Sequence, residues 1–254
     1  MYIQYHWMPY HRKGYSVLTI KDLSITRGQG EQSFTVSLPH LSLAEGEVVS
    51  LCGSSGCGKS TLLEMMGLIL KPDNLSQYEL SSDTLSMDLA PLILSNNQKT
   101  LAEIRSKNLG FMLQNGGLLP FLSVWQNILL PCQTNGILAD ESWLHLCEKL
   151  NINHLMTKYP KQLSIGERQR VAFVRSIAHK PLLLLADEPT SALDPHHSEV
   201  LFHLMLSLAK QQKIAVLLVT HDWDLVQRNE LRTFSAKLDM SLRQSCFIEQ
   251  ANNN

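Results

Sequence analysis

Apolar residues along the chain fall into short continuous runs that alternate with stretches of helical spacing. Such runs cover residues 48–52, 109–113, 182–186 and 214–220. A short run that is apolar at nearly every position is typical of a strand buried on both faces of a parallel sheet. The pattern therefore predicts an α/β fold with a mostly parallel sheet at its centre.

Helical spacing of apolar residues follows two of these runs, in residues 59–70 and 195–212. Between residues 123 and 179 the pattern is again helical, and Ser123 and Asp140 are the expected N-caps of two helices there. A helical block is therefore inserted between two strands of the predicted sheet.

Other stretches carry little pattern. Residues 72–108 are rich in Ser, Asn, Asp and Gln, which predicts an irregular surface arm with short elements. The tail after Arg232 is weakly patterned, and residues 252–254 are expected to fray. Residues 1–15 lack the apolar core of a signal peptide, so they predict a loose leader.

Composition narrows the class of protein. With 254 residues, of which 44% are hydrophobic, the chain has enough apolar residues for one large α/β domain. The formal net charge of -1 gives no basic field, so we expect no nucleic-acid partner. The five cysteines show no metal-ligand spacing, which favours reduced thiols. No apolar run reaches the roughly 20 residues that span a bilayer, so a membrane role needs a separate spanning partner.

A glycine-rich segment follows the first apolar run and matches the pattern G-x-x-x-x-G-K-[ST]. Glycines allow successive backbone N–H groups to point at phosphate oxygens, and the helix that follows adds its positive end. The lysine supplies a full charge to the β- and γ-phosphates, and the next hydroxyl can ligate Mg²⁺. We therefore expect ATP and Mg²⁺ as cofactors, held by Gly53, Ser54, Ser55, Gly56, Cys57, Gly58, Lys59, Ser60 and Thr61.

Two acids end the apolar run at 182–186, where a parallel strand presents its carboxyl end to ligands. Beside a phosphate loop, Asp187 is expected to hold Mg²⁺ together with Ser60. Glu188 is expected to polarise the attacking water as a general base. Without that loop, two acids after a strand would indicate no more than a solvated turn.

The remaining motifs carry a family resemblance. The segments are Leu-Ser-Ile-Gly-Glu-Arg-Gln-Arg at 163–170, Ser-Ala-Leu-Asp at 191–194, Thr-His-Asp at 220–222 and Phe-Met-Leu-Gln at 111–114. In this order and spacing they resemble the signature, D-loop, switch histidine and Q-loop of ABC ATPases. The resemblance extends from about residue 18 to 228 and implies an ATP-hydrolysing subunit of an ABC transporter.

Within that family, residues 118–128 with Pro131, and residues 159–163, are most similar to the lipoprotein-releasing and macrolide-export ATPases. This likeness implies export or membrane extraction of a lipophilic or peptide-like substrate.

The resemblance implies a P-loop NTPase core with a mostly parallel sheet, an N-terminal antiparallel β portion and an inserted helical subdomain. The expected division of the single domain is a RecA-like core with its β portion at 16–114 and 180–238, a helical subdomain at 115–179, and poorly specified termini at 1–15 and 239–254.

It also implies a head-to-tail dimer with a second copy or a paralogue, in which Ser164, Gly166 and Glu167 meet the nucleotide of the other protomer. Asp194 would contact the partner across this interface. Integral membrane subunits are the other implied partners. They would place the protein in the cytoplasm, on the inner face of the membrane.

Two further catalytic roles follow from the resemblance. His221 would hydrogen-bond the γ-phosphate and keep Glu188 aligned with the water. Gln114 would ligate Mg²⁺ or the water and report the nucleotide state to the helical block.

The sequence departs from the family pattern at two places. Ile165 replaces the first glycine of the signature, and a β-branched residue is costly there if the position needs a positive φ. On that argument, Ile165→Gly should raise turnover. Arg27 stands where the family places an aromatic residue against adenine, so either its guanidinium or Phe34 would stack on the base.

Two other features have simpler interpretations. Cys57 inside the loop is explained by its small size, and the His196–His197 pair by a solvated helix face rather than a metal site.

Three functions remain open at this level. A transporter motor would bind membrane subunits through the apolar region 115–131, which contains Phe121, Trp125 and Ile128. A soluble ABC protein acting on nucleic acid or ribosomes would be expected to carry a second cassette or a long insert. A regulatory clamp with weak turnover is supported only by Ile165.

Overall fold

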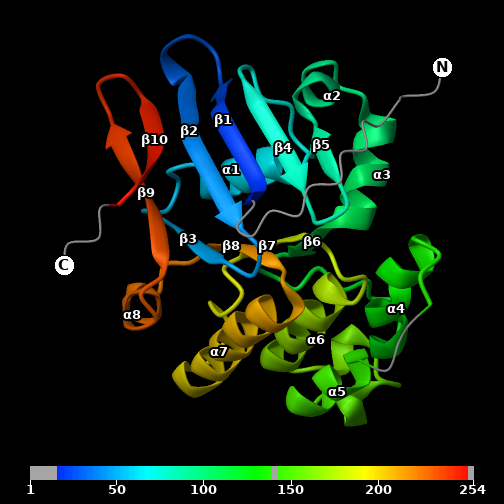
Figure 1. Cartoon of the computed structure of the whole chain (residues 1–254). Helices are drawn as coiled ribbons and strands as arrows, with labels where there is room; N and C mark the ends of the chain where they lie inside the picture. Colours follow the sequence, from blue (N-terminus) through cyan, green and yellow to red (C-terminus); the bar gives the residue numbers. More distant parts are fainter. Residues whose placement is uncertain (1–15, 139–141, 251–254) are drawn as a thin grey trace, which may run out of the picture.

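The computed structural model describes residues 16–138 and 142–250, and the described strands form a single ten-stranded sheet (Figure 1). Their order is β5-β4-β1-β2-β10-β9-β3-β8-β7-β6. The expected leader at 1–15, the N-cap at Asp140 and the fraying at 252–254 lie outside the described residues.

The part of the sheet built from the start of the chain is antiparallel, as the family resemblance implies. β1 (Ser16–Arg27) pairs with β2 (Phe34–Ala44) on one side and with β4 (Gln77–Ser81) on the other. β4 also pairs with β5 (Ser86–Asp88), and a 3-10 turn at Gly30–Gln32 connects β1 to β2.

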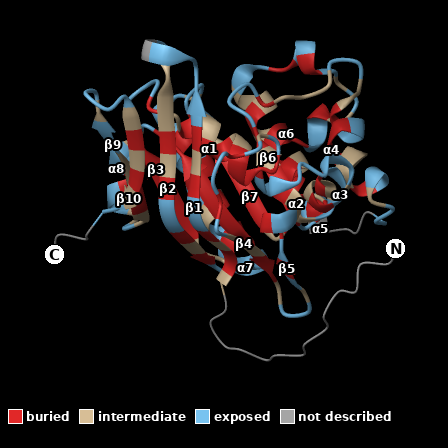
Figure 2. Ribbon diagram, turned by 90° about the horizontal axis from the view of Figure 1, so that it is seen from above, coloured by how far each residue is buried: buried red, intermediate tan, exposed pale blue. Residues whose placement is uncertain are grey.

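The other part of the sheet is parallel and contains the continuous apolar runs. β3 (Val48–Cys52) lies between β8 (Ala215–Val219) and β9 (Arg232–Asp239). β7 (Leu183–Asp187) lies between β8 and β6 (Leu109–Met112). Every residue of β3 and β8 is buried. Figure 2 shows buried residues concentrated in the middle of the molecule, around the neighbouring strand β7. The predicted α/β fold with a mostly parallel central sheet is confirmed.

Apolar clusters cover both faces of this sheet. Leu183 and Leu185 of β7 pack into one cluster, whereas Leu184 and Ala186 pack into the other. This alternation explains the unbroken apolar run, because each face of the strand is buried against a different layer. The first layer includes α1 (Lys59–Met66), α2 (Ala90–Leu94) and α3 (Gln98–Asn108). The second layer includes α7 (Pro195–Gln212), α8 (Trp223–Arg228) and the helical block.

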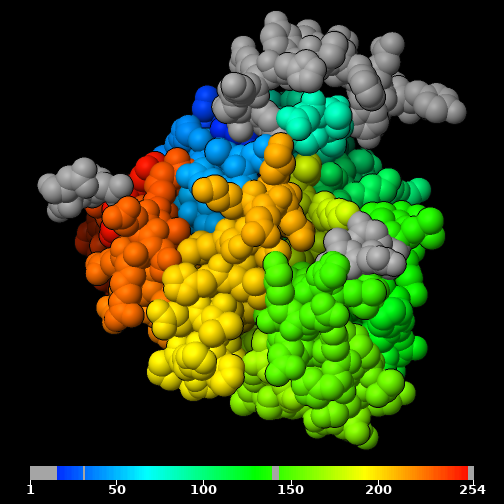
Figure 3. All heavy atoms as spheres, turned by 60° about the horizontal axis from the view of Figure 1, so that its bottom comes forward, coloured from blue at the N-terminus to red at the C-terminus, as the bar shows by residue number. Residues whose placement is uncertain are grey.

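The helical block lies between β6 and β7 in the chain. Figure 3 shows its green surface directly beside the yellow surface of α7. Ser123 caps its first helix as predicted, since its hydroxyl accepts a hydrogen bond from the backbone N–H of Gln126. In turn, the side-chain oxygen of Gln126 accepts a hydrogen bond from the backbone N–H of Ser123. The elements of the block are α4 (Val124–Thr134), α5 (Ser142–Lys149), α6 (Ile165–Ile177) and 3-10 turns at Asn153–Leu155 and Pro160–Gln162.

The short elements expected at 72–108 are present, but the expectation that they form an irregular surface arm was wrong. These residues form β4, β5, α2 and α3, and they contribute the fully buried Tyr78 to the core. The Tyr78 hydroxyl donates a hydrogen bond to the carbonyl of Met66 in α1. Buried positions in this stretch are separated by exposed polar ones, and elements this short do not complete a recognisable period.

The weakly patterned tail also forms regular structure. β9 and β10 (Gln244–Glu249) make a hairpin, and β10 lies between β9 and β2. The stretch 239–254 therefore contains a sheet strand rather than only an unspecified end. Another boundary moved as well, because α1 ends at Met66 instead of continuing to residue 70; Leu68 has a left-handed φ of 58° that is incompatible with a helix.

Candidate functional site

The phosphate loop connects β3 to α1 at the carboxyl end of the parallel strands (Figure 1). Gly56 and Gly58 have φ of 80° and 97°, in the region that L side chains rarely adopt. A Cβ at Gly58 would lie 2.4 Å from Cγ2 of Val36 in β2, so the loop is also packed tightly against that strand. Gly58 is therefore required by both conformation and space, and Gly56 by conformation alone.

Lys59 begins α1, and its side chain turns back over the loop. Nζ donates to the carbonyls of Gly53 and Ser54 at 2.8 Å and 3.0 Å, and only 9% of the residue is exposed. The ammonium is thereby placed among the backbone groups that are expected to surround phosphate. Ser54 and Ser55 are exposed on the loop, and Thr61 is half-buried in the first turn of α1.

Ser60 connects the loop to the end of β7. Its Oγ donates to Oδ2 of Asp187 at 3.3 Å. The pKa of Asp187 is raised above its ordinary value, chiefly by burial and also by the nearby charge of Glu188. The hydrogen bond from Ser60 and the charge of Lys59 oppose this rise. A partly desolvated carboxylate beside a hydroxyl is the kind of oxygen-donor pair that a divalent cation would stabilise.

Glu188 follows β7 with a left-handed φ of 47°, which is uncommon for a residue other than glycine. Its backbone N–H donates to the carbonyl of Val219 in β8, and its own carbonyl accepts from Ser191. These bonds hold the strained backbone in place.

The carboxylate of Glu188 contacts residues that follow the two strands on either side of β7. Its Oε2 accepts a hydrogen bond from Nε2 of Gln114 at 3.2 Å and lies 3.3 Å from Nδ1 of His221. Gln114 follows β6 and His221 follows β8, on either side of β7 in the sheet. The fold thus brings together three residues predicted as catalytic from distant parts of the chain.

The signature residues form a second group at the start of α6. Ser164 is the N-cap, its hydroxyl accepts the N–H of Glu167, and Glu167 accepts the N–H of Ser164 at 2.7 Å. A Cβ at Gly166 would lie 3.0 Å from Cδ2 of Leu193, immediately before Asp194. The structure therefore places the signature next to the D-loop segment.

The expected strain at Ile165 is not present. Ile165 is the first residue of α6 and is not among the described residues with positive φ. An isoleucine adopts the first helical position without left-handed backbone, so the φ argument for low turnover was wrong. Its side chain is 51% exposed beside Ser164, and any effect on turnover would have to come from its bulk.

Asp194 is the N-cap of α7. This capping role explains an aspartate at this position even without a contact to a second protomer. Its carboxylate accepts the backbone N–H of His197 at 3.2 Å and lies 2.6 Å from Nδ1 of the same residue. These bonds, with the backbone N–H first, lower the pKa of Asp194. His196 and His197 are both exposed, and their rings meet edge to face with centroids 5.5 Å apart.

The two candidates for adenine stacking are direct neighbours. Arg27 and Phe34 are paired across β1 and β2, two positions from the Val36 that contacts the phosphate loop. Arg27 is exposed and Phe34 is half-buried against the core, so both flank the loop on the same strand pair. Cys57 instead points into the core and is 2% exposed, which agrees with a packing role.

The sequence analysis assigned no role to two residues of α6, Gln169 and Arg175. Both donate side-chain hydrogen bonds to backbone carbonyls of the segment that starts at Gln114. A signal was available only for Arg175, which directly follows the apolar run Val171–Val174, because Gln169 lies between two arginines.

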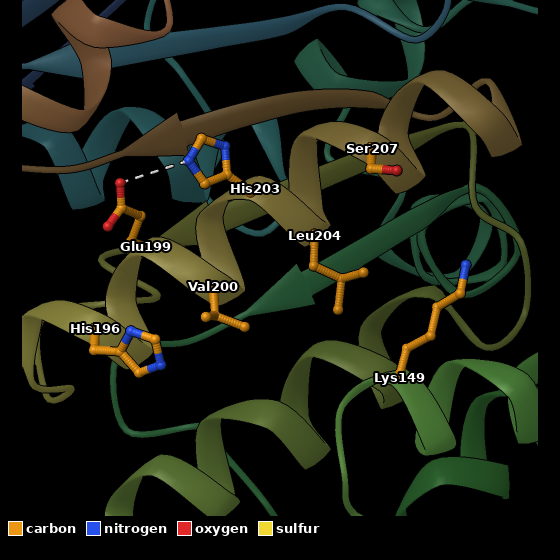
Figure 4. Close-up of a pocket in the computed structure, with 7 residues that line it drawn as sticks. All are labelled: Lys149, His196, Glu199, Val200, His203, Leu204 and Ser207. Carbon is orange, nitrogen blue, oxygen red and sulfur yellow. Dashed lines mark ion pairs between the residues drawn. The ribbon is translucent and has the colours of Figure 1, made fainter.

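A separate hollow of about 500 Å³ lies between α5 and α7 (Figure 4). None of the predicted site residues lines it, and the labelled ion pair within it joins Glu199 to His203 at 3.8 Å. Its lining residues are Lys149, His196, Glu199, Val200, His203, Leu204 and Ser207.

The sequence profile of the ABC transporter family matches residues 37–191, from β2 to the D-loop segment. The chain belongs to the ABC transporter ATPase family. The predicted membership of the ABC family is thereby confirmed.

Curated relatives of this ABC ATPase are lipoprotein-releasing ATPases. It is 37% identical over 217 residues to the lipoprotein-releasing system ATP-binding protein LolD of Rickettsia bellii, covering 84% of this chain and 91% of that protein. It is 39% identical over 191 residues to LolD 1 of Rhodospirillum rubrum, covering 74% and 80%. The expected likeness to lipoprotein-releasing ATPases is confirmed.

Solved structures support the assignment to the ABC family. The dimeric bacterial ABC transporter cassette MJ0796 aligns with a TM-score of 0.73 and 29% identity over 90% of this chain and 96% of that one. Its post-hydrolysis dimer bound to ADP and Pi aligns with a TM-score of 0.75 and 28% identity over 93% and 99%. The chain is therefore an ATP-binding and ATP-hydrolysing subunit of the ABC type. In the described parts, no helix combines the length and apolar character needed to cross a bilayer.

Proposed function

We propose that this ABC ATPase drives export or membrane extraction of a lipophilic or peptide-like substrate of the lipoprotein type. The main observation behind this proposal is the contact of the Glu188 carboxylate with Gln114 and His221. The preceding residue, Asp187, contacts Ser60 of the phosphate loop. The substrate class comes from the names of the LolD relatives.

We assign a part in hydrolysis to each element. The loop N–H groups and Lys59 hold the phosphates, because they combine donors with a fixed positive charge. Ser60 and Asp187, which lie within 3.3 Å of each other, would supply oxygen ligands to Mg²⁺ together with Gln114, and the ion would neutralise charge on the β- and γ-phosphates. Glu188 orients and polarises the attacking water as general base. His221 donates toward the γ-phosphate while contacting Glu188.

The proposed working unit is a head-to-tail dimer of two copies, or of this chain and a paralogue. The MJ0796 cassettes similar to it are dimeric. The start of α6 offers the backbone N–H groups of Ile165 and Gly166, which as first-turn groups have no acceptor within the helix, to a phosphate of the other protomer. The positive end of the helix adds to this attraction. Asp194 and its neighbours lie beside this end and would contact the partner.

The proposed membrane partner docks on the helical block. Phe121 is 71% exposed and Trp125 is 41% exposed at the start of α4, in the segment that follows Gln114. Exposed aromatic side chains are favoured at protein interfaces. Such docking would hold this chain in the cytoplasm on the inner face of the membrane.

The test is a pair of variants that separates nucleotide binding from hydrolysis. Lys59→Ala should lower ATP affinity by about tenfold or more, because it removes a charge-assisted phosphate contact. Glu188→Gln should retain Mg-ATP but lower turnover about 10²- to 10⁴-fold, the range of general-base catalysis. The exposed residues Lys210→Ala and Glu103→Gln are the matched controls.

An alternative function is a nucleotide-binding clamp with weak turnover, for which the exposed Ile165 at the signature is the supporting observation. Single-turnover assays distinguish the two functions. If the wild-type protein hydrolyses bound ATP as slowly as Glu188→Gln, the clamp is correct and the motor is wrong.

A further inference from the structure

The segment after β6 is held by side chains of α6. Gln169 is 1% exposed, and its Nε2 donates to the backbone carbonyl of Gln114. Arg175 donates from one guanidinium nitrogen to the carbonyl of Gly117 at 2.7 Å and from another to that of Gly116 at 3.0 Å. Three carbonyls of residues 114–117 are thus bound by two side chains of one helix.

Close packing supports the same contact. Gly116 and Gly117 have φ of 73° and 58°, and a Cβ at Gly116 would lie 3.4 Å from Cβ of Ala172. Ala172 lies three residues from both Gln169 and Arg175, so the contacts come from one face of α6. The segment therefore follows the helix surface and is bound along it.

The burial of the Gln169 amide is energetically unfavourable, because only one of its two polar atoms has a hydrogen-bond partner among the described residues. Its Oε1 is buried and has no hydrogen-bond partner among the described residues. Burying half of an amide without a partner is unfavourable. A role for the Nε2 bond to Gln114 would explain why a polar side chain occupies this buried position.

The same helix begins at the signature. Its N-terminal end holds Ser164 and Gly166, and one turn later Gln169 holds the backbone of Gln114, whose side chain reaches Glu188. A displacement of α6 would therefore move the amide of Gln114 relative to the Glu188 carboxylate. This gives a continuous set of contacts from the start of α6 to the carboxylate.

We propose that Gln169 and Arg175 are positioning residues of the hydrolytic centre, which fix the backbone at Gln114 so that its amide stays against Glu188. The proposal rests on the proposed catalytic roles of Gln114 and Glu188. Neither residue of α6 touches the phosphate loop in the described contacts, so both act through Gln114.

Single variants give the first test, with purified full-length protein. Gln169→Met removes the donor at similar size and should lower kcat about tenfold, the effect expected from one buried hydrogen bond, while KM for ATP changes less than about twofold. Arg175→Met should act similarly, and Arg175→Lys should recover part of the loss because it keeps a donor. Ser176→Ala is the control, since Ser176 is buried on α6 but bonds only within its own helix.

A double-mutant cycle tests whether Gln169 acts through Gln114. Gln114→Ala combined with Gln169→Met should have the kcat of Gln114→Ala alone, because the amide that Gln169 positions has been removed. Independent, multiplying losses would overturn the proposal. So would a Gln169→Met variant with unchanged kcat, or one whose KM rises as much as kcat falls.

Two further outcomes are distinguishable. If Gln114→Ala itself leaves kcat unchanged, the proposed catalytic role of Gln114 is wrong, whatever Gln169 does. If Gln169→Met unfolds, as judged by its melting temperature beside Ser176→Ala, the Arg175→Lys and Arg175→Met pair decides, and equal kcat values in these two variants and the wild type contradict the proposal.

Discussion

Nδ1 of His221 lies 3.3 Å from Oε2 of Glu188, the same oxygen that accepts the hydrogen bond from Gln114. The carboxylate therefore has a partner from the strand on each side of its own. Together with the backbone bonds that hold Glu188 at positive φ, this fixes the orientation of the proposed base.

The contact predicts that His221 contributes to hydrolysis more than to binding. His221→Ala should lower turnover about hundredfold, a typical loss for a group that aligns a catalytic base, while ATP affinity changes less than about threefold. Turnover assays and nucleotide titrations measure the two effects, with His203→Ala on the exposed face of α7 as control. A large loss of affinity at normal turnover would contradict the alignment role.

The phosphate loop predicts different costs for its glycines. Gly58→Ala would place a Cβ 2.4 Å from Val36 at a φ of 97°, so it should abolish ATP binding or folding. Gly56 has a φ of 80° but open space around its Cβ position, so Gly56→Ala should cost only the conformational penalty of about 1–2 kcal/mol. Thermal unfolding and ATP titration of both variants measure this. Equal effects would mean that contact with Val36 contributes nothing.

The elements that the sequence predicted correctly are those with strong local signals. The buried runs of β3, β7 and β8, and the helix that starts at Pro195, are long or uniformly apolar enough to be recognised alone. β10 was missed because its pairing with β2 joins residues about two hundred positions apart, and its own pattern is short. Long-range pairing of this kind leaves no local signal.

The same distinction applies to the site. The phosphate loop and the two acids at the end of β7, Asp187 and Glu188, were predictable, because their chemistry is local in the sequence. The bonds of Gln169 and Arg175 to the segment after β6 were not, because they depend on how α6 packs beside that segment. The condition on which the Ile165 argument depended, a positive φ, is not met, since the signature continues directly into a helix rather than a turn.

The corrected conformation of Ile165 changes what its replacement should do. If bulk at the proposed dimer interface limits turnover, Ile165→Ala and Ile165→Gly should raise it by similar factors, because both remove the branched side chain. Gly should in addition destabilise α6 by about 0.5–1 kcal/mol relative to Ala. Turnover and thermal unfolding of the two variants separate these effects. An increase confined to Gly would restore a backbone explanation.

The capping box of α6 predicts a pH-dependent contribution to stability. The backbone N–H of Ser164 binds the Glu167 carboxylate and lowers its pKa below the ordinary 4.5. A lowered folded pKa means that the stabilisation is present above the unfolded pKa and is lost as pH falls through the folded pKa. Glu167→Ala should therefore lower stability by about 0.5–1 kcal/mol near pH 7 and by less under acid conditions. A difference in melting temperature that stays constant down to pH 3 would contradict the capping role.

Phe121 offers the clearest test of the proposed membrane partner. At 71% exposure its side chain contributes little to the fold, whereas Trp125 packs edge-on against Trp143 at 4.7 Å and a charge there would also disturb α4 and α5. Phe121→Asp should release the protein from membranes, because an unpaired charge is costly in an apolar interface. ATP binding should be unchanged.

Met240→Asp is the matched control for this variant, because Met240 is 76% exposed on the distant β9–β10 hairpin. Membrane fractionation of cells that express each variant, followed by ATP titration of the purified proteins, measures both properties. Release by Phe121→Asp alone supports docking on the helical block. Equal retention of both variants would remove Phe121 from the interface, and equal release would point to a general effect of added charge.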